Sequence, residues 1–175
     1  QLNSEINVTS RLGRGSSFRF TLEKVAAKLP SAQAAKPRNT TFSGMKVLCV
    51  DDQQENLDAL STLLEKWGVS VTLANNWDDA LSLAVSVKPQ ILLMDYQLSF
   101  EEEKNGLALI ELIRTTLNVV VPAALITATP DENLVVQCKE QGVNFLAKPL
   151  KPAKLRALLQ SMTRYIREAK NVERD

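Results

Sequence analysis

The regular alternation of two kinds of segment between residues 45 and 166 constrains the fold of this chain most. Short apolar runs follow one another along the chain, and each leads into a longer segment whose apolar side chains recur at helical spacing. The runs that predict strands are 46–50, 69–74, 91–94, 123–126 and 143–147. The segments that predict helices are 56–67, 77–87, 106–115, 132–141 and a last one with an apolar stripe over 155–166. Their strict alternation predicts an α/β fold.

The composition of the strands predicts how they are arranged. Apolar runs without alternation are typical of strands buried on both faces, as in a parallel sheet covered by helices on each side. Right-handed crossovers leave few topologies, and the simplest is a doubly wound five-stranded parallel sheet with strand order 2-1-3-4-5. Ligands of such sheets bind beyond the carboxyl ends of the strands, so we expect the functional residues there.

The residues before this unit follow a different pattern. Residues 1–23 hold two stretches of alternating apolar and polar residues around the turn signal Leu-Gly-Arg-Gly-Ser at 12–16, which predicts a β-hairpin. Residues 24–44 lose this periodicity and are rich in Ala, Lys, Pro, Ser and Thr, as is typical of a linker. We therefore expect a hairpin, a linker, one domain over 45–162 and a basic helical extension or tail over 163–175.

Charge and composition exclude several classes of protein. Residues 45–150 carry seven basic and fifteen acidic side chains, whereas 1–44 carry seven and two, and 151–175 carry seven and three. The net charge of +1 is thus an average over an acidic middle and two basic ends. The sequence contains no histidine, which excludes a Ser-His-Asp triad, an HExxH zinc site and a phosphohistidine on these residues.

Targeting and redox signals point to the cytoplasm. The sequence has no apolar run of about 18 residues and no apolar leader, so we expect no membrane contact by this fragment. Cys49 and Cys138 lie within apolar or helical segments, which is typical of reduced thiols rather than of a disulfide framework. The expected location is therefore cytoplasmic, with any membrane anchor left to a longer parent protein.

Polar residues follow the predicted strands at the point where each strand ends. Asp51 and Asp52 follow the first strand, Asp95 the third, Thr127 the fourth and Lys148 the fifth. Because the carboxyl ends of neighbouring parallel strands meet at one edge of the sheet, we expect these five side chains to converge. Taken singly, each has an ordinary reading, since an Asp at a strand end often caps a helix and a lysine is usually solvated.

Together, these residues predict phosphoryl chemistry. Three carboxylates in one place repel one another, and a hard divalent cation such as Mg²⁺, or Mn²⁺, relieves that repulsion. A lysine and a threonine supply charge and a hydrogen bond to a phosphate group. A carboxylate can itself attack phosphorus and form an aspartyl phosphate. Asp95 is the expected nucleophile, because it stands alone at the end of the central strand.

The same residues resemble a known family. Val-Asp-Asp at 50–52, Leu-Met-Asp at 93–95, Ile-Thr-Ala at 126–128 and Leu-Ala-Lys-Pro at 146–149 are similar to the motifs of response-regulator receiver domains. The resemblance covers about residues 45–162 and implies a flavodoxin-like (βα)5 fold that takes a phosphoryl group from a phosphohistidine and switches conformation.

The resemblance also assigns roles to individual residues. It makes Asp95 the phosphoacceptor and implies that Asp51, Asp52, Asp95 and the backbone carbonyl of Gln97 hold Mg²⁺. It further implies that the phosphoryl group is bound by Thr127, Ala128 and Lys148. By the same resemblance, Phe145 is the aromatic residue that changes rotamer with Thr127.

The loops around Asp95 carry two further expectations. Gln97 and Thr129 lie beside the expected phosphorylation site, where they could affect the approach of water, so they are candidates for setting the lifetime of the acyl phosphate. The loop after Asp95 lacks the usual Met-Pro and is longer than typical of the family. We expect its acidic residues Glu101, Glu102 and Glu103 to form a solvated loop, with an effect on metal affinity or partner choice as the alternative.

The N-terminal segment has a resemblance of its own. The Leu-Gly-Arg-Gly-Ser-Ser-Phe segment at 12–18 and the Phe-Thr-Leu that follows at 20–22 resemble the last glycine box and final strands of a histidine-kinase ATP-binding domain. The whole chain then resembles the C-terminal fragment of a hybrid sensor histidine kinase, and the segment 148–156 with Trp67-Gly68 is similar to receivers of the PAS-containing type.

This resemblance leaves the phosphodonor outside the chain. Most of the ATP-binding domain and the phosphorylatable histidine are missing, so the donor would be the chain's own kinase core or a histidine-phosphotransfer protein. Whether this chain counts as an enzyme stays open, because the receiver promotes only its own phosphorylation. A homodimer is compatible with the sequence but is not specified by it.

Three other functions remain as alternatives. A phosphorylation-independent interaction module would not need the complete set of polar strand ends. A haloacid-dehalogenase-type phosphohydrolase would need its nucleophile after the first strand with a second acid two positions later, whereas that strand ends Asp51-Asp52-Gln53. No nucleic-acid partner is expected, since the sequence leaves no room for a helix-turn-helix after residue 150. The basic side chains of the tail instead predict a solvated helix face; they are Arg164, Arg167, Lys170 and Arg174.

Overall fold

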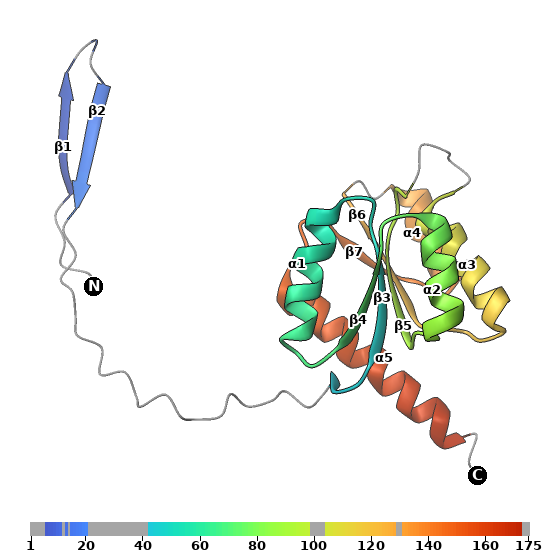
Figure 1. Cartoon of the computed structure of the whole chain (residues 1–175). Helices are drawn as coiled ribbons and strands as arrows, with labels where there is room; N and C mark the ends of the chain where they lie inside the picture. Colours follow the sequence, from blue (N-terminus) through green and yellow to red (C-terminus); the bar gives the residue numbers. More distant parts are fainter. Residues whose placement is uncertain are drawn as a thin grey trace, which may run out of the picture. The chain divides into compact units, whose positions relative to one another are not determined.

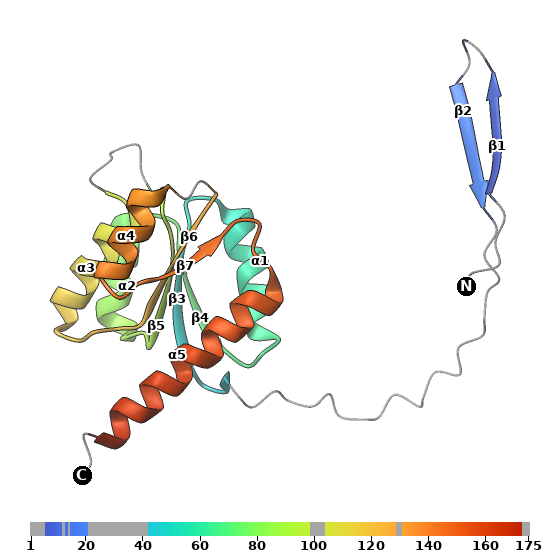
Figure 2. The same ribbon diagram turned by 180° about the vertical axis from the view of Figure 1, so that it is seen from behind.

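The computed structural model of the chain describes residues 6–11, 13, 15–20, 42–98, 104–128 and 131–172. The chain divides into two compact units, Gln1–Pro37 and Arg38–Asp175. Figures 1 and 2 show both units from opposite sides. Most of the predicted linker, residues 24–41, lies outside the described residues.

The described part of the first unit is a two-stranded antiparallel hairpin. Its strands β1 (Ile6–Arg11) and β2 (Gly15–Phe20) pair from Ile6 opposite Phe20 to Arg11 opposite Gly15. Gly13 and Gly15 have φ angles of 74° and 90° in the turn, where a side chain would be strained. The predicted hairpin is confirmed, and its descent from a kinase domain stays a prediction.

The second unit is a five-stranded parallel sheet with helices on both faces. Its strand order is β4-β3-β5-β6-β7, which is the predicted order 2-1-3-4-5. The strands are β3 (Lys46–Val50), β4 (Ser70–Ala74), β5 (Ile91–Asp95), β6 (Ala123–Thr127) and β7 (Asn144–Ala147). The helices are α1 (Gln54–Glu65), α2 (Trp77–Val87), α3 (Gly106–Leu117), α4 (Glu132–Glu140) and α5 (Pro152–Val172).

The helices divide between the two faces of the sheet. Helices α1 and α5 cover one face, and α2, α3 and α4 cover the other (Figures 1 and 2). Successive residues of a strand point to opposite faces, so Val47 and Cys49 of β3 pack with α1 and α5, whereas Leu48 and Val50 pack with the other three helices. The inner strands β3, β5 and β6 are therefore buried almost throughout, as their apolar runs predict.

The edges of the unit differ from the predictions in two places. The edge strand β7 has exposed or half-buried residues throughout, unlike the fully buried strand that we expected, because an edge strand has a neighbour on one side only. Phe42, three residues before the expected start of the domain, is 1% exposed and packs beside Trp67 in the core. Helix α5 runs without a break through Ile166 into the predicted extension.

Within the residues that the structure describes, no helix is both long and apolar enough to cross a bilayer. Cys49 and Cys138 are buried, and neither forms a disulfide.

Candidate functional site

The predicted polar residues lie together at the carboxyl edge of the sheet. Asp51 follows the last residue of β3, Asp95 ends β5, Thr127 ends β6 and Lys148 follows β7. The parallel register sets these strand ends side by side: Asp95 is paired with Ile126, and Thr127 with Ala147. The backbone N–H of Lys148 also donates to the Thr127 carbonyl at 2.7 Å, which holds the last two residues next to each other.

Asp51 is held by donors from its own loop and from the first turn of α1. Its Oδ1 accepts hydrogen bonds from the Gln53 backbone N–H at 3.0 Å and from Asn56 Nδ2 at 2.9 Å. The Asn56 amide also reaches Asp51 Oδ2 at 3.1 Å. An Asp that accepts from the backbone two residues on forms an Asx turn, which leads the chain from the strand into the helix. The carboxylate is therefore fixed although the strand has already ended.

Lys148 joins the two buried carboxylates. Its Nζ lies 2.9 Å from Asp51 Oδ2 and 3.1 Å from Asp95 Oδ1. The side chains of Asp51 and Asp95 are 9% and 8% exposed, against 24% for Lys148. Burial acts to lower the pKa of Lys148, but hydrogen bonds to both acids and their charges outweigh it and leave that pKa raised. The ammonium is thus a charged internal counter-ion.

Asp95 carries a charge that its surroundings disfavour. Desolvation by burial raises the pKa of Asp95, and the nearby charge of Asp51 acts in the same direction. The hydrogen bond and charge of Lys148 and a backbone hydrogen bond with Tyr96 lower the pKa without cancelling the rise. A carboxylate that is this poorly solvated is a more reactive nucleophile than one in water.

Three carboxylates can share one cation here. Asp51, Asp52 and Asp95 each offer an oxygen, and these oxygens lie within 4.8 Å of one another. Asp52 is exposed, whereas the other two are buried, so the cluster opens to solvent on the Asp52 side. Carboxylate oxygens are the ligands that hard divalent cations prefer, and a partly hydrated site suits Mg²⁺. The donor set therefore fits the predicted metal.

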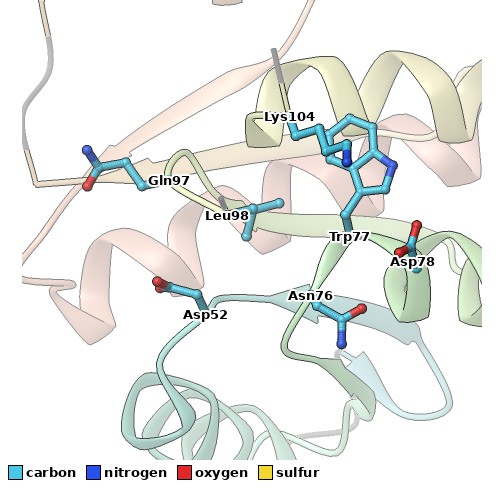
Figure 3. A pocket seen from close by; sticks show the side chains of 7 residues that line it. All are labelled: Asp52, Asn76, Trp77, Asp78, Gln97, Leu98 and Lys104. Carbon is cyan, nitrogen blue, oxygen red and sulfur yellow. The ribbon is translucent and has the colours of Figure 1, made fainter. Parts of the chain in front are cut away.

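A cavity of about 520 Å³ adjoins Asp52, and Figure 3 shows the side chains that line it. Gln97, the residue expected to supply a backbone carbonyl, lines this cavity together with Leu98. The opposite end is formed by Trp77 and Lys104 (Figure 3). Solvent therefore reaches the acidic cluster from the side of α2.

Gly106 brings helix α3 against the backbone of Asp95. A Cβ at this position would collide with the carbonyl oxygen of Asp95 and would lie 3.0 Å from Leu125 Cδ1. The Gly106 N–H donates to the Tyr96 carbonyl at 2.9 Å, and Asn105 caps the helix by accepting from Leu107 and Ala108. This close approach fixes the position of the Asp95 backbone.

The remaining predicted site residues differ in burial, and the structure does not describe all of them. Thr127 is 2% exposed, Ala128 is exposed, and Phe145 is half-buried on β7. Thr129 and the acidic loop residues 101–103 lie outside the described residues. Asn56 and Gly106 also belong to the site, although the sequence pattern predicts both only as parts of helices. An amide one turn into the helix after an Asp pair, and a glycine opening the helix after Asp95, were the available signals.

Comparison with known proteins decides the family. The family model described as "Response regulator receiver domain" matches residues 47–160. The chain belongs to the response regulator receiver family. It therefore contains a receiver domain of two-component signalling, a class of domain that interacts with histidine kinases or phosphotransfer proteins, and the resemblance seen in the sequence is confirmed.

The most similar curated proteins include large sensor kinases. The sensor histidine kinase AruS of Pseudomonas aeruginosa is 33% identical over 165 residues, covering 90% of this chain and 16% of AruS. The autoinducer 2 sensor kinase/phosphatase LuxQ of Vibrio parahaemolyticus is 30% identical over 156 residues, covering 86% of this chain and 18% of LuxQ. The chain thus spans less than a fifth of the length of these relatives.

A solved structure supports the fold of the receiver. A response regulator protein from Burkholderia pseudomallei is 26% identical, with a TM-score of 0.60 over 75% of this chain and 75% of that one. That protein carries a phosphorylated aspartic acid, a calcium ion and citrate.

Proposed function

We propose that the receiver accepts a phosphoryl group on Asp95 from a phosphohistidine donor. The observation that carries this proposal is the Lys148 ammonium, which lies 2.9 Å from Asp51 and 3.1 Å from Asp95. It sets a fixed positive charge where the oxygens of an incoming phosphoryl group must lie. In the step itself, a carboxylate oxygen of Asp95 forms a bond to phosphorus while the bond from phosphorus to the donor imidazole breaks, and solvent protonates the released imidazole.

The other residues position the group and balance its charge. Asp51, Asp52, Asp95 and the backbone carbonyl of Gln97 would hold Mg²⁺, which would supply positive charge to offset that of the acids and of the phosphoryl group. Lys148 then exchanges Asp95 for a phosphoryl oxygen, and Thr127 and the Ala128 N–H bind the other phosphoryl oxygens. Catalysis here is positioning together with charge neutralisation.

The same contacts provide a conformational switch. Thr127 lies buried at the end of β6, and Phe145 lies half-buried on the neighbouring strand β7. Movement of the Thr127 hydroxyl toward the phosphoryl group leaves space that Phe145 fills by changing rotamer. A new charge at Asp95 thereby changes the surface around β7, which is how a phosphorylated site can alter partner binding.

The parent protein in this proposal is a cytoplasmic or membrane-anchored hybrid sensor histidine kinase. Two observations support it: the alignments with AruS and LuxQ cover more of the chain than residues 47–160, and a hairpin precedes the receiver. The donor is then the parent's own kinase core or a histidine-phosphotransfer protein. A phosphotransfer profile of the chain against both kinds of donor checks this assignment, and transfer from neither kind contradicts it.

A mass measurement tests the acceptor. The chain incubated with acetyl phosphate and Mg²⁺ should gain the mass of one phosphoryl group, and Asp95→Asn should gain none. Asp58→Asn is the matched control, since Asp58 lies exposed on α1 and bonds only to Gln54 among the contacts described. Equal phosphorylation of Asp95→Asn and the wild type would overturn the proposal.

A further inference from the structure

The amide of Asn56 contacts both oxygens of Asp51. Its Nδ2 lies 2.9 Å from Oδ1 and 3.1 Å from Oδ2. A carboxylate can only accept hydrogen bonds, so the orientation of the Asn56 amide is settled by its partner. Asn56 is half-buried in the first turn of α1, where the helix backbone fixes the base of its short side chain.

The hydrogen-bond acceptor sites of Asp51 are fully used. Oδ1 receives Gln53 N–H and Asn56, and Oδ2 receives Asn56 and Lys148. Two carboxylate oxygens offer about four lone-pair directions. A cation that binds Asp51 must therefore displace one of these donors.

Lys148 is the donor best able to leave. The Gln53 N–H belongs to the backbone that starts α1, and Asn56 has a short side chain on the same rigid turn. Lys148 has a long flexible stem and a second partner in Asp95 at 3.1 Å. Once Lys148 moves away, one lone pair of Asp51 Oδ2 is free to bind a cation, and Asn56 still contacts both oxygens of Asp51.

We infer that Asn56 is a positioning residue for the cation site. It holds the Asp51 carboxylate in one orientation while Lys148 leaves, so that the freed lone pair faces the space shared with Asp52 and Asp95. Partners that orient a metal-binding carboxylate typically change metal affinity by about 10- to 100-fold when they are removed. This inference rests on the proposed function, and it assigns Asn56 to the affinity for the cation rather than to the phosphoryl step.

Direct measurement of Mn²⁺ binding tests the inference without phosphoryl chemistry. The electron paramagnetic resonance signal of free Mn²⁺ gives the dissociation constant for the wild type, Asn56→Leu and Asn56→Ala. We expect both variants to bind about tenfold more weakly. Gln54→Ala is the matched control, because Gln54 is an amide in the same helical turn that bonds to Asp58 instead of the site.

The outcomes separate this inference from the proposed function. A wild type that takes up no Mn²⁺ overturns both. If the two Asn56 variants bind Mn²⁺ as tightly as the wild type, the role of Asn56 is overturned but the proposed function is not. The same follows if Gln54→Ala loses as much Mn²⁺ affinity as the Asn56 variants.

A kinetic split distinguishes positioning from a general structural role. With acetyl phosphate, the Mg²⁺ concentration for half-maximal phosphorylation should rise about tenfold in Asn56→Ala, and the rate at saturating Mg²⁺ should stay within about twofold. A fall in the saturating rate with an unchanged half-maximal concentration would contradict the inference.

Discussion

Asp51 and Asp95 end neighbouring strands and are buried to nearly the same extent, at 9% and 8% side-chain exposure, yet their surroundings differ. Asp51 accepts from a backbone N–H, from the Asn56 amide and from Lys148. Burial raises the pKa of Asp95, and the hydrogen bonds and charge that it receives do not offset that rise. Two equally buried carboxylates therefore differ. Hydrogen bonds fix the orientation of Asp51, whereas the charge of Asp95 is poorly stabilised, which makes Asp95 the more reactive of the two.

The difference follows from what comes after each acid in the chain. After Asp51 the chain turns directly into α1, whose first residues present donors to the carboxylate. After Asp95 the next helix, α3, begins only at Gly106, whose backbone packs against that of Asp95 and Tyr96. Helix starts stabilise negative charge through their free N–H groups. A local sequence feature thus assigns different roles to two identical side chains.

Removal of Lys148 should have the largest effect, because both acids depend on it. Lys148→Met keeps the aliphatic stem but leaves no charge for the phosphoryl oxygens. Loss of one such preorganised group costs about 100- to 1000-fold in rate, roughly 3–4 kcal/mol of transition-state stabilisation. The rate of Asp95 phosphorylation by acetyl phosphate measures it, with Lys139→Met on the exposed face of α4 as the control. A loss below about tenfold would remove Lys148 from the proposed role.

A side chain at Gly106 should disturb the Asp95 end without touching the Asp51 end. Gly106→Ala sets a Cβ against the Asp95 carbonyl, so we expect about 2–3 kcal/mol of destabilisation in urea unfolding. Gly142→Ala is the control, because its surroundings are open and only its φ of +59° is strained, which costs about 1 kcal/mol. Equal losses in the two variants would contradict the close packing at Asp95.

Neutralising each acid in turn should change stability in opposite directions. Asp51→Asn cannot accept from Gln53, Asn56 and Lys148 together, so we expect a loss of about 1–2 kcal/mol. Asp95→Asn removes a charge that burial disfavours, so its stability should equal or exceed that of the wild type by up to about 1 kcal/mol. Urea unfolding at pH 7 measures the free energy of unfolding of both variants. Equal losses of stability would contradict the difference between the two acids.

The smallest expected effect is on the pH dependence of stability. The raised pKa of Asp95 means that the folded protein keeps a proton at a pH where the unfolded chain has lost it. Unfolding then releases a proton, so this carboxyl lowers stability as pH rises above 3.8 through its folded pKa. The stability difference between Asp95→Asn and the wild type should thus grow with pH over this window, by less than about 1 kcal/mol. A difference that is constant with pH contradicts the shift.

Much of the fold could be predicted because the relevant signals are local. The apolar runs at residues 46–50, 91–94 and 123–126 are the inner strands, and right-handed crossovers leave few strand orders, of which the simplest is the observed one. The exposure of each residue of β7 could not be predicted from the strand order alone, because it depends on how the helices cover the edge of the sheet. Phe42 was assigned to the linker for a similar reason: only packing against Trp67 shows that it belongs to the core.

The site divides in the same way. Sequence alone determined which residues stand at the strand ends, since strand order and direction bring Asp51, Asp95 and Lys148 to one edge. The contacts of Asn56 and the approach of Gly106 were decided by tertiary structure, because they depend on where a helix packs. Chain order fixes which groups meet, but the distances that distinguish a held carboxylate from a reactive one arise only when the helices dock on the sheet.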